Sequence, residues 1–458
     1  MIENDAFKLL LINLFHLNPN DITNIVCTTF NKMMVLLVTL ADKHQACPYC
    51  GFTAPKIKEY VTKEITHSAL TTQKCIIKYR ARRYKCPCCG KTYYEFNPFV
   101  FKSQKISILT VHNILKDLKD FNETFTSVAR RYHVSPTSVS TIFDNHVDIG
   151  RNPLPEIINF DEVYAFKSEK SKYVCVLLDF KKQIPVDVLP NRKKEYLLNY
   201  FQKIPLEERK KVKYACSDMY EVYRDVVHKV FPEAKHLLDY FHLSQDFHKK
   251  MNEVRIKVMK GYKDNKASDE YYLLKKFNWL LFKNPEDEDK HGRLFDVERE
   301  RKYNSHFKSY MNYYDLRKKI LEINNDLTIC YSLKLELVDF YSKSTIDNAQ
   351  VNLEHLIRSC IDTNIEEMIK FSNNLINWKQ EIINSFTIVG TEYKVEADKG
   401  QVVVCNKKVN NAIIENRNKI IKCIKNNANG YTNWSRFRNR VMYVLDPNTT
   451  FSLEPREK

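Results

Sequence analysis

This chain of 458 residues contains little glycine and no long apolar run. Only eight glycines occur, and none forms the glycine-rich phosphate loop of P-loop or dinucleotide-binding folds. ATP-driven and redox chemistries are therefore disfavoured, and we expect no nucleotide cofactor. The longest apolar run near the start, residues 33–41 with one threonine, is too short to span a bilayer. No basic, apolar and small-residue signal opens the chain, so we expect a soluble, cytoplasmic protein without a membrane partner.

Acidic residues are outnumbered, since 73 Lys and Arg stand against 56 Asp and Glu and give a formal net charge of +17. Such a charge favours a polyanionic partner, with nucleic acid ahead of an anionic membrane surface. The thirteen cysteines do not suit a small secreted disulfide scaffold. Four of them occur in paired motifs that indicate metal ligation in a reducing compartment.

The paired motifs are two CxxCG sequences, at residues 47–51 and 86–90. Cysteines three positions apart can bind one ion, and the glycine allows the turn that points backbone amides at the sulfurs. The motifs predict a zinc ribbon with the four ligands of a structural Zn²⁺ site, Cys47, Cys50, Cys86 and Cys89. Unrelated buried thiols are the alternative, and Cys88, Cys75 and His67 are possible substitute ligands.

The strand-like run that leads into the second motif places Lys78, Arg80 and Arg82 on one face. Such a face suits a phosphate backbone. A solvated charged strand without a ligand is the alternative.

A helical pattern from residue 106 to residue 147 contains a helix-turn-helix signal. Val128, Ala129 and Tyr132 form an apolar stripe, and Ser135 with Pro136 supplies an N-cap and a first-turn proline for the second helix. We expect the hydroxyl side chains of that helix to point outward and to contact bases or phosphates in a major groove. These residues are Thr137, Ser138, Ser140 and Thr141. A purely structural helical pair is the alternative.

After a proline-rich linker, three strand-like runs are followed by a helix, a strand, a helix and a strand, which is the order of a ribonuclease H-like fold. The first run ends at Asp161 and the fourth at Asp218. Because chemistry in open α/β sheets gathers at the carboxyl ends of strands, we expect these two acids to meet.

The expected third acid is Glu415, because a helix over residues 410–419 can pack on the sheet and direct this carboxylate at the site. Glu392 and Glu396 are substitutes in a less regular stretch. Asp239 and His242 stand at the end of another strand. They either tune bound metals or cap the next helix.

Two aspartates and a glutamate can hold two Mg²⁺ (or Mn²⁺) ions about 4 Å apart for phosphodiester cleavage. We assign Asp161 as the bridging ligand, Asp218 to one ion and Glu415 to the other. Water attack would nick a strand, and the released 3′-hydroxyl could attack a second DNA. No ATP is required.

Near the C-terminus, aromatics alternate with arginines, as on a DNA-facing surface. The residues expected to contact DNA there are Trp434, Arg436, Arg438 and Arg440.

Taken in order, these segments resemble the transposases of bacterial insertion sequences of the IS-L-three family. The resemblance covers nearly the whole chain and rests on the two CxxCG motifs and on residues 160–162, 218–220, 231–232, 239–242, 331–334, 411–415, 429–434 and 436–440. It implies cut-and-join transposition by a DDE catalytic domain, binding of terminal inverted repeats, and Mg²⁺ use. It also implies a bacterial, nucleoid-associated protein that forms at least a homodimer on paired DNA ends.

The predicted fold is multidomain α+β, with a ribonuclease H-like core interrupted by an all-α insertion. The expected segments are an N-terminal helical and strand segment (1–42), the zinc ribbon (43–104), the helix-turn-helix (105–150), the first part of the core (151–242), the insertion (243–386), the C-terminal part of the core (387–446) and a tail (447–458). Two other functions remain open: a catalytically inactive or domesticated DNA-binding regulator, and a ribonuclease H-like nuclease that cuts without rejoining.

The net charge predicts that DNA binding weakens steeply as salt rises, because each neutralised phosphate releases counterions. Affinity measured by fluorescence anisotropy over a series of salt concentrations checks this. A nearly flat salt dependence would contradict an interface dominated by phosphate contacts.

Overall fold

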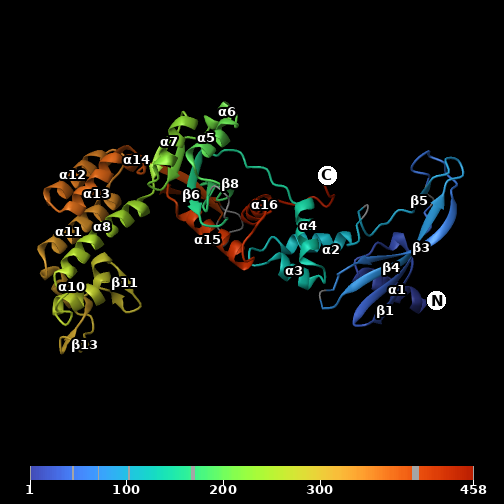
Figure 1. The fold of residues 1–458 in the computed structure, drawn as a ribbon, viewed down its shortest axis with the longest axis horizontal. Coiled ribbons are helices and arrows are strands. Elements are labelled where there is room, and N and C mark those ends of the chain that lie inside the picture. Colours follow the sequence, from blue (N-terminus) through green and yellow to red (C-terminus); the bar gives the residue numbers. More distant parts are fainter. Residues whose placement is uncertain are drawn as a thin grey trace.

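The computed structural model describes residues 2–43, 46–70, 72–101, 104–166, 171–394 and 402–456. The molecule is elongated (Figure 1): a β-rich unit and three short helices lie at one end, a mixed sheet lies in the middle, and a helical body lies at the other end. Among the described residues, no helix is both long enough and apolar enough to cross a membrane.

The N-terminal unit is a sheet with the strand order β1-β2-β4-β3, to which β5 adds along β4. Leu11 and Phe15 pack against its buried face with Ile65, Ile77 and Tyr79. Its elements are α1 (Ile2–Leu14), the 3-10 helix η1 (Pro19–Asp21), β1 (Ile22–Phe30), β2 (Met33–Leu40), β3 (Lys56–Thr66), β4 (Cys75–Lys85) and β5 (Thr92–Tyr94).

Three helices follow, α2 (Ile108–Asp117), α3 (Phe125–Arg131) and α4 (Pro136–His146). The predicted N-cap is present, because the Ser135 side chain accepts a hydrogen bond from the Ser138 amide and Pro136 opens the helix. The turn between α3 and α4 contains His133 in a left-handed conformation, with φ of 52°.

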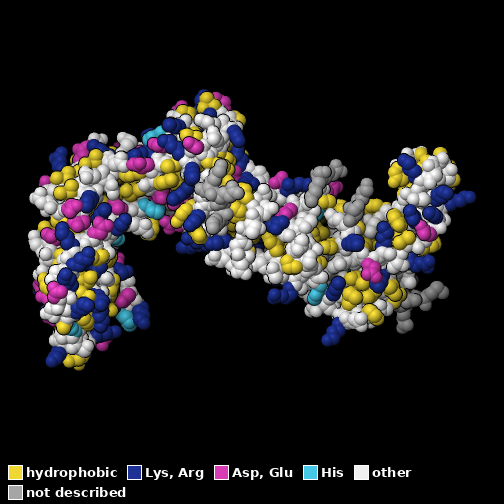
Figure 2. Space-filling view, in the orientation of Figure 1, with side chains coloured by type: hydrophobic (Ala, Val, Ile, Leu, Met, Phe, Trp, Pro, Cys, Tyr) yellow, Lys and Arg dark blue, Asp and Glu magenta, His cyan; other side chains and the backbone are white. Residues whose placement is uncertain are grey.

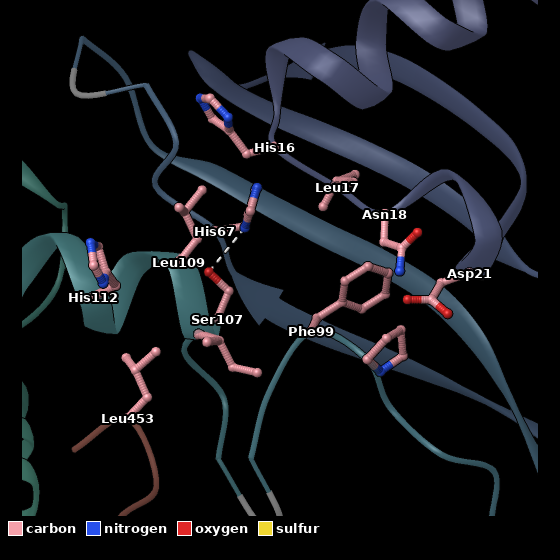
Figure 3. Close-up of a pocket in the computed structure, with 12 residues that line it drawn as sticks. His16, Leu17, Asn18, Asp21, His67, Phe99, Ser107, Leu109, His112 and Leu453 are labelled. Carbon is pink, nitrogen blue, oxygen red and sulfur yellow. Dashed lines mark hydrogen bonds between the residues drawn. The ribbon is translucent and has the colours of Figure 1, made fainter.

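A cavity of about 450 Å³ lies where the sheet meets α2 (Figure 3). Burial lowers the pKa of His67 there, so the neutral ring donates from Nε2 to the Phe15 carbonyl and accepts at Nδ1 from the Ser107 hydroxyl, at 2.8 and 2.9 Å. Ser107 is also the N-cap of α2. One buried histidine thus links the sheet to the first helix of the three.

The central sheet has the strand order β10-β9-β6-β7-β8. Strands β6, β7 and β8 pair antiparallel, whereas β9 pairs parallel with β6, and β10 pairs parallel with β9. The strands are β6 (Ile157–Val163), β7 (Val174–Asp179), β8 (Pro185–Leu189), β9 (Tyr214–Ser217) and β10 (Lys235–Leu238). The predicted sequence of strands and helices is present.

Helices cover both faces of this sheet, as its nearly continuous apolar strands require. Phe160 and Leu177 pack on one side against residues of α5 (Lys194–Gln202) and α7 (Glu221–Val230), with α6 (Leu206–Arg209) between these helices in the chain. Val163 and Val176 pack on the other side against α15 (Ala412–Asn427) and α16 (Trp434–Leu445). Residues from both ends of the chain therefore share one core.

The helical body separates β10 from α15 in the sequence and has its own large core. Its helices are α8 (Tyr240–Lys260), α9 (Asp269–Lys276), η2 (Asn278–Phe282), α10 (Tyr313–Glu322), α11 (Asn325–Lys343), α12 (Ala349–Asp362), α13 (Glu366–Asn377) and α14 (Lys379–Asn384). A hairpin of β15 (Ile388–Lys394) and β16 (Val402–Lys408) then leads to α15.

The prediction of an all-α insertion is wrong in one place. Two short hairpins interrupt the helices, β11 (Glu288–Asp289) with β12 (Gly292–Arg293), and β13 (Lys302–Asn304) with β14 (Ser309–Met311). Gly292 and Lys308 provide the left-handed turns, with φ of 93° and 49°. Strands of two or three residues are too short to show a period in the sequence.

The three arginines of α16 are all engaged in contacts within the protein, and one of them is buried. Arg440 is only 1% exposed, and its guanidinium donates to the carbonyls of Asp120 and Glu123, each at 2.8 Å. Arg438 bonds Asp187 at 2.7 Å and Arg436 bonds Asp144 at 2.6 Å. These side chains join α16 to the three helices and to the sheet, so the prediction of an arginine surface is wrong for Arg440.

Replacing Arg440 with alanine should destabilise the fold by at least about 2 kcal/mol, because two carbonyls lose their donor and a fully buried side chain is removed from the core. Arg436→Ala is the matched control on the same helix, and its partly exposed ion pair should contribute less than about 1 kcal/mol. Scanning calorimetry measures both variants. Equal melting temperatures for Arg440→Ala and wild type would contradict a structural role for this guanidinium.

Candidate active site

The register of three parallel strands places three acids at one level of the sheet. Asn159 of β6 pairs with Cys216 of β9, so Asp161 and Asp218, each two residues further on, continue that alignment. Ser217 pairs with Leu238 of β10, so Asp218 and Asp239 do the same. Side chains at matched positions of neighbouring strands point to the same side of the sheet, and these acids therefore converge.

The start of α15 is tied to β6 by buried amides. The Asn159 side chain donates to the Asn411 side-chain oxygen and to the Asn410 carbonyl, at 2.7 and 2.8 Å. The Asn411 amide donates in return to the carbonyl of Phe160 at 3.2 Å. Both asparagines are fully buried, so the position of the first turn of α15, which contains Glu415, is fixed relative to the strand of Asp161.

The structure also brings Asp239 and His242 into the same site. One ligand atom each from Asp239, His242 and Glu415 lie within 4.8 Å of one another. Asp239 directly follows β10 and is the N-cap residue of α8, which places His242 in the first turn of that helix. The Asp239 side chain makes no capping hydrogen bond, so the capping alternative gains no support, and a role beside bound metals stays a prediction.

Burial and mutual repulsion favour protonated acids at this site. Burial, followed by the charge of Asp218, raises the pKa of Asp161 to about 7, with further contributions from Glu415 and Asp239, while His242 lowers it. Burial also raises the pKa of Asp218 and of Asp239, and His242 opposes the shift in both. A bound cation would relieve this repulsion.

The donor set fits a divalent cation. Oδ1 of Asp218 and Nε2 of His242 are buried without a hydrogen-bond partner among the described residues. Unsatisfied buried polar atoms are costly unless a ligand meets them. Carboxylate oxygens are the preferred ligands of Mg²⁺ and Mn²⁺.

Two residues that the sequence did not single out support the acids. The Asn418 amide donates to Oδ2 of Asp161 at 2.8 Å. Asn418 lies three residues after Glu415 on the same face of α15, and this spacing could have predicted that it reaches the site. Arg192 lowers the pKa of Asp218 by its charge. Its guanidinium is held over the rings of Tyr173 and Tyr220, at 4.6 and 4.9 Å from their centroids, and nothing in its sequence context indicated this position.

The structure does not describe the side chains of the two substitute acids, Glu392 and Glu396. Glu396 lies outside the described residues, and of Glu392 only the backbone, within β15, is described.

The four cysteines of the CxxCG motifs form one cluster. Their sulfur atoms lie within 4.8 Å of one another, with Cys47 to Cys89 at 3.7 Å and Cys50 to Cys86 at 3.6 Å. Two sulfurs on a tetrahedral zinc ion lie about 3.8 Å apart. Gly51 and Gly90 have positive φ values of 74° and 69°, as the motif requires. The cluster is therefore suited to bind zinc.

The thiols of this cluster also depend on one another electrostatically. Backbone amides, first that of Cys89, lower the pKa of Cys86 to about 7. For Cys50 a backbone hydrogen bond at Phe52 lowers the pKa, but desolvation and the neighbouring sulfurs outweigh it and raise the value to about 12. Four thiolates therefore need a cation at the centre of the cluster.

The residues predicted to contact DNA differ in exposure. Arg80 is exposed, whereas Lys78 pairs with Glu64 at 2.7 Å. Arg82 bonds Glu95 at 2.7 Å and is only 14% exposed at its side chain, so its guanidinium is already occupied.

On α4, Thr137 and Thr141 are exposed and Ser138 is half-buried. Ser140 was predicted to point outward, but it is buried and donates to the Thr137 carbonyl at 2.9 Å. Trp434 packs at 5.2 and 5.8 Å from the rings of Phe166 and Phe437, which leaves it only partly accessible.

Comparison with known proteins identifies the family of this chain. A family model described as transposase, that of the DDE transposases of the IS-L-three type, matches residues 158–397, more than half of the chain. The chain is also 19% identical, over 408 residues, to the transposase for insertion sequence element IS1001 of Bordetella parapertussis, covering 89% of this chain and 90% of that protein. The chain belongs to the IS-L-three family of transposases, which are enzymes that act on DNA. The matched residues include Asp161, Asp218, Asp239 and His242 and end before Glu415.

Without divalent metal, Asp161 should make the protein less stable as pH rises. The unfolded chain releases this proton near the ordinary value of 3.8 and the native state near 7, so between these pH values the native state binds more protons and its stability falls. Because a tenfold change in proton affinity is worth about 1.4 kcal/mol, Asp161→Asn should gain up to about 4 kcal/mol over wild type between pH 4 and pH 8.

Urea unfolding at several pH values, without added divalent ions, measures this difference. Asp225→Asn is the control: a hydrogen bond from Lys194 lowers the pKa of Asp225, so its replacement should bring no gain as pH rises. A pH-independent difference between Asp161→Asn and wild type would contradict the prediction.

Proposed function

We propose that this transposase is a DDE enzyme that binds the terminal inverted repeats of an insertion sequence and cleaves and joins DNA strands, with Asp161, Asp218 and Glu415 as its metal ligands. The convergence of these acids at one end of the central sheet is the observation that supports the proposal. The sheet supports it further: three antiparallel strands with two parallel strands added beside the first match the strand arrangement expected of a ribonuclease H-like core.

Two Mg²⁺ or Mn²⁺ ions, when bound, would activate the attacking oxygen and neutralise charge on the phosphate. Neighbouring side chains orient the carboxylates that would hold these ions. Asn418 holds Oδ2 of Asp161, and the Asn159–Asn411 contacts hold the first turn of α15. Asp239 and His242 stand beside Glu415 and can join or position the ligand set, in keeping with a preorganised site.

The N-terminal units are proposed to bind the repeat. The cysteine cluster lies beyond the end of β4, and the three helices lie between it and the central sheet (Figure 1). Exposed Arg80, Thr137 and Thr141 are the contacts that remain accessible, with Lys78 available once its pair with Glu64 opens. Binding there would hold the DNA end while the central sheet acts on the strand, and assembly of a homodimer would pair the two ends.

Asp161→Asn and Glu415→Gln should each lower metal-dependent strand nicking by about a thousandfold or more, because groups that act as a unit fail together. The substrate is DNA carrying the inverted repeats that flank the gene. Glu207→Gln, at an 81% exposed side chain, is the control and should nick normally. All three variants should bind the repeat like wild type.

The products separate this proposal from the two alternatives. Strand-transfer products with wild type support a transposase. Nicks without joining would favour a nuclease, and binding without any metal-dependent cleavage would favour a regulator.

A further inference from the structure

The two short hairpins lie at the free end of the helical body (Figure 1). Residues of both hairpins, of α9 and of α10 line a cavity there. Its volume is about 460 Å³. The lining includes the aromatic residues Tyr272, Tyr303 and Tyr313 and the cationic residues Lys276, Lys290 and Lys302. None of these residues belongs to the candidate active site or to the N-terminal units.

The hairpin of β13 and β14 exposes an aromatic pair. Tyr303 and Tyr310 are cross-strand partners, and their ring centroids lie 5.4 Å apart. Their exposed fractions are 59% and 68%. Beside them, Tyr272 of α9 stacks on His306 at 4.0 Å with nearly parallel rings, which packs the turn of the hairpin against that helix. Two large exposed rings side by side on one hairpin are typical of a binding surface.

The charges around the cavity leave lysines available. Asp289 is paired with Arg299 at 2.6 Å, and Asp315 with Arg301 at 3.0 Å. Lys290 and Lys302 have no ion pair within the described part of the chain, and Glu300 is the other acid of the lining. Figure 2 shows Lys and Arg side chains gathered over this end of the molecule.

Flat rings with adjacent lysines suit a nucleic-acid strand. Bases stack on exposed aromatic rings and phosphates pair with lysines, largely independently of sequence. Only an unpaired strand offers its base faces, because a duplex has them stacked on one another. An acidic protein would use the lysines but would have no need for the two rings.

We propose that the hairpins of residues 288–311 form a second DNA-binding surface, which takes an unpaired strand with bases on Tyr303 and Tyr310 and phosphates at Lys290 and Lys302. The inference rests on the proposed function, since it assumes a DNA substrate. Helix α8 directly follows Asp239 and has 21 residues, so it extends about 30 Å away from the acids. A strand that leaves the active site along α8 would need about nine nucleotides at the 3.4 Å rise of a stacked DNA strand, and fewer where its bases are unstacked and its backbone is extended.

The test measures binding of a fluorescent oligothymidine and of a duplex of the same length to the full chain. Tyr303→Ala with Tyr310→Ala should weaken single-strand binding at least about tenfold and leave duplex binding unchanged. Tyr303→Phe with Tyr310→Phe keeps both rings and should bind like wild type. Lys290→Ala with Lys302→Ala should reduce the salt dependence of single-strand binding, whereas Lys263→Ala with Lys266→Ala, at exposed positions between α8 and α9, should not.

A second readout locates the contact. An iodouracil-substituted strand, irradiated in complex with wild type, should cross-link to the peptide that contains Tyr303 or Tyr310, as identified by mass spectrometry. Unchanged single-strand binding by the alanine pair, cross-links confined to other segments, or an equal loss of duplex binding would each overturn the inference. If one of these results is obtained while wild type in the same preparation nicks repeat DNA normally, the second binding surface is refuted and the proposed function is not.

Discussion

Parallel pairing of β9 with β6 on one side and with β10 on the other is the constraint on which the site depends. This pairing sets Asp161, Asp218 and Asp239 at one level, and a slip of one residue in β6 would turn Asp161 to the opposite face of the sheet. The hydrogen bond between the Asn159 and Asn411 side chains then fixes the position of α15 relative to β6, although the two elements are separated by more than two hundred residues in the sequence. Hydrogen bonds between buried amides, rather than the acids themselves, hold together a site whose carboxylates repel one another.

The helical body is inserted between parts of the site and is firmly joined to it. It begins at Asp239, and α14 packs back on β10 through the Asn384 amide, which donates to the His236 carbonyl at 2.9 Å. The Arg224 guanidinium of α7 lies 4.3 Å from the centroid of the Trp378 ring. These contacts join the helical body to the sheet directly before Asp239 and before the first turn of α8, which contains His242.

Local chemistry explains which features the sequence predicted. Four cysteines in two CxxCG motifs can form little besides one cluster, and apolar strands that end in acids imply a shared sheet edge. The direction of a long side chain is not encoded so locally. The arginines of α16 alternate with aromatics as a DNA-facing surface would, yet Arg440 is buried because the segment between α2 and α3 places the carbonyls of Asp120 and Glu123 opposite it. Ser140 follows Val139 directly and lies within the apolar stripe that reaches Phe143, so its hydroxyl is turned inward.

The packing of α16 against the three N-terminal helices has a consequence for synthesis of the protein. Phe143 and Val128 share a core with Phe437 and Val441, and the Tyr443 hydroxyl donates to the Leu115 carbonyl at 3.0 Å. The three helices are translated early, but their shared core is complete only after α16 has been synthesised. A chain truncated before α16 therefore exposes the apolar surface of these three helices, and exposed apolar surface of this kind favours aggregation and proteolysis.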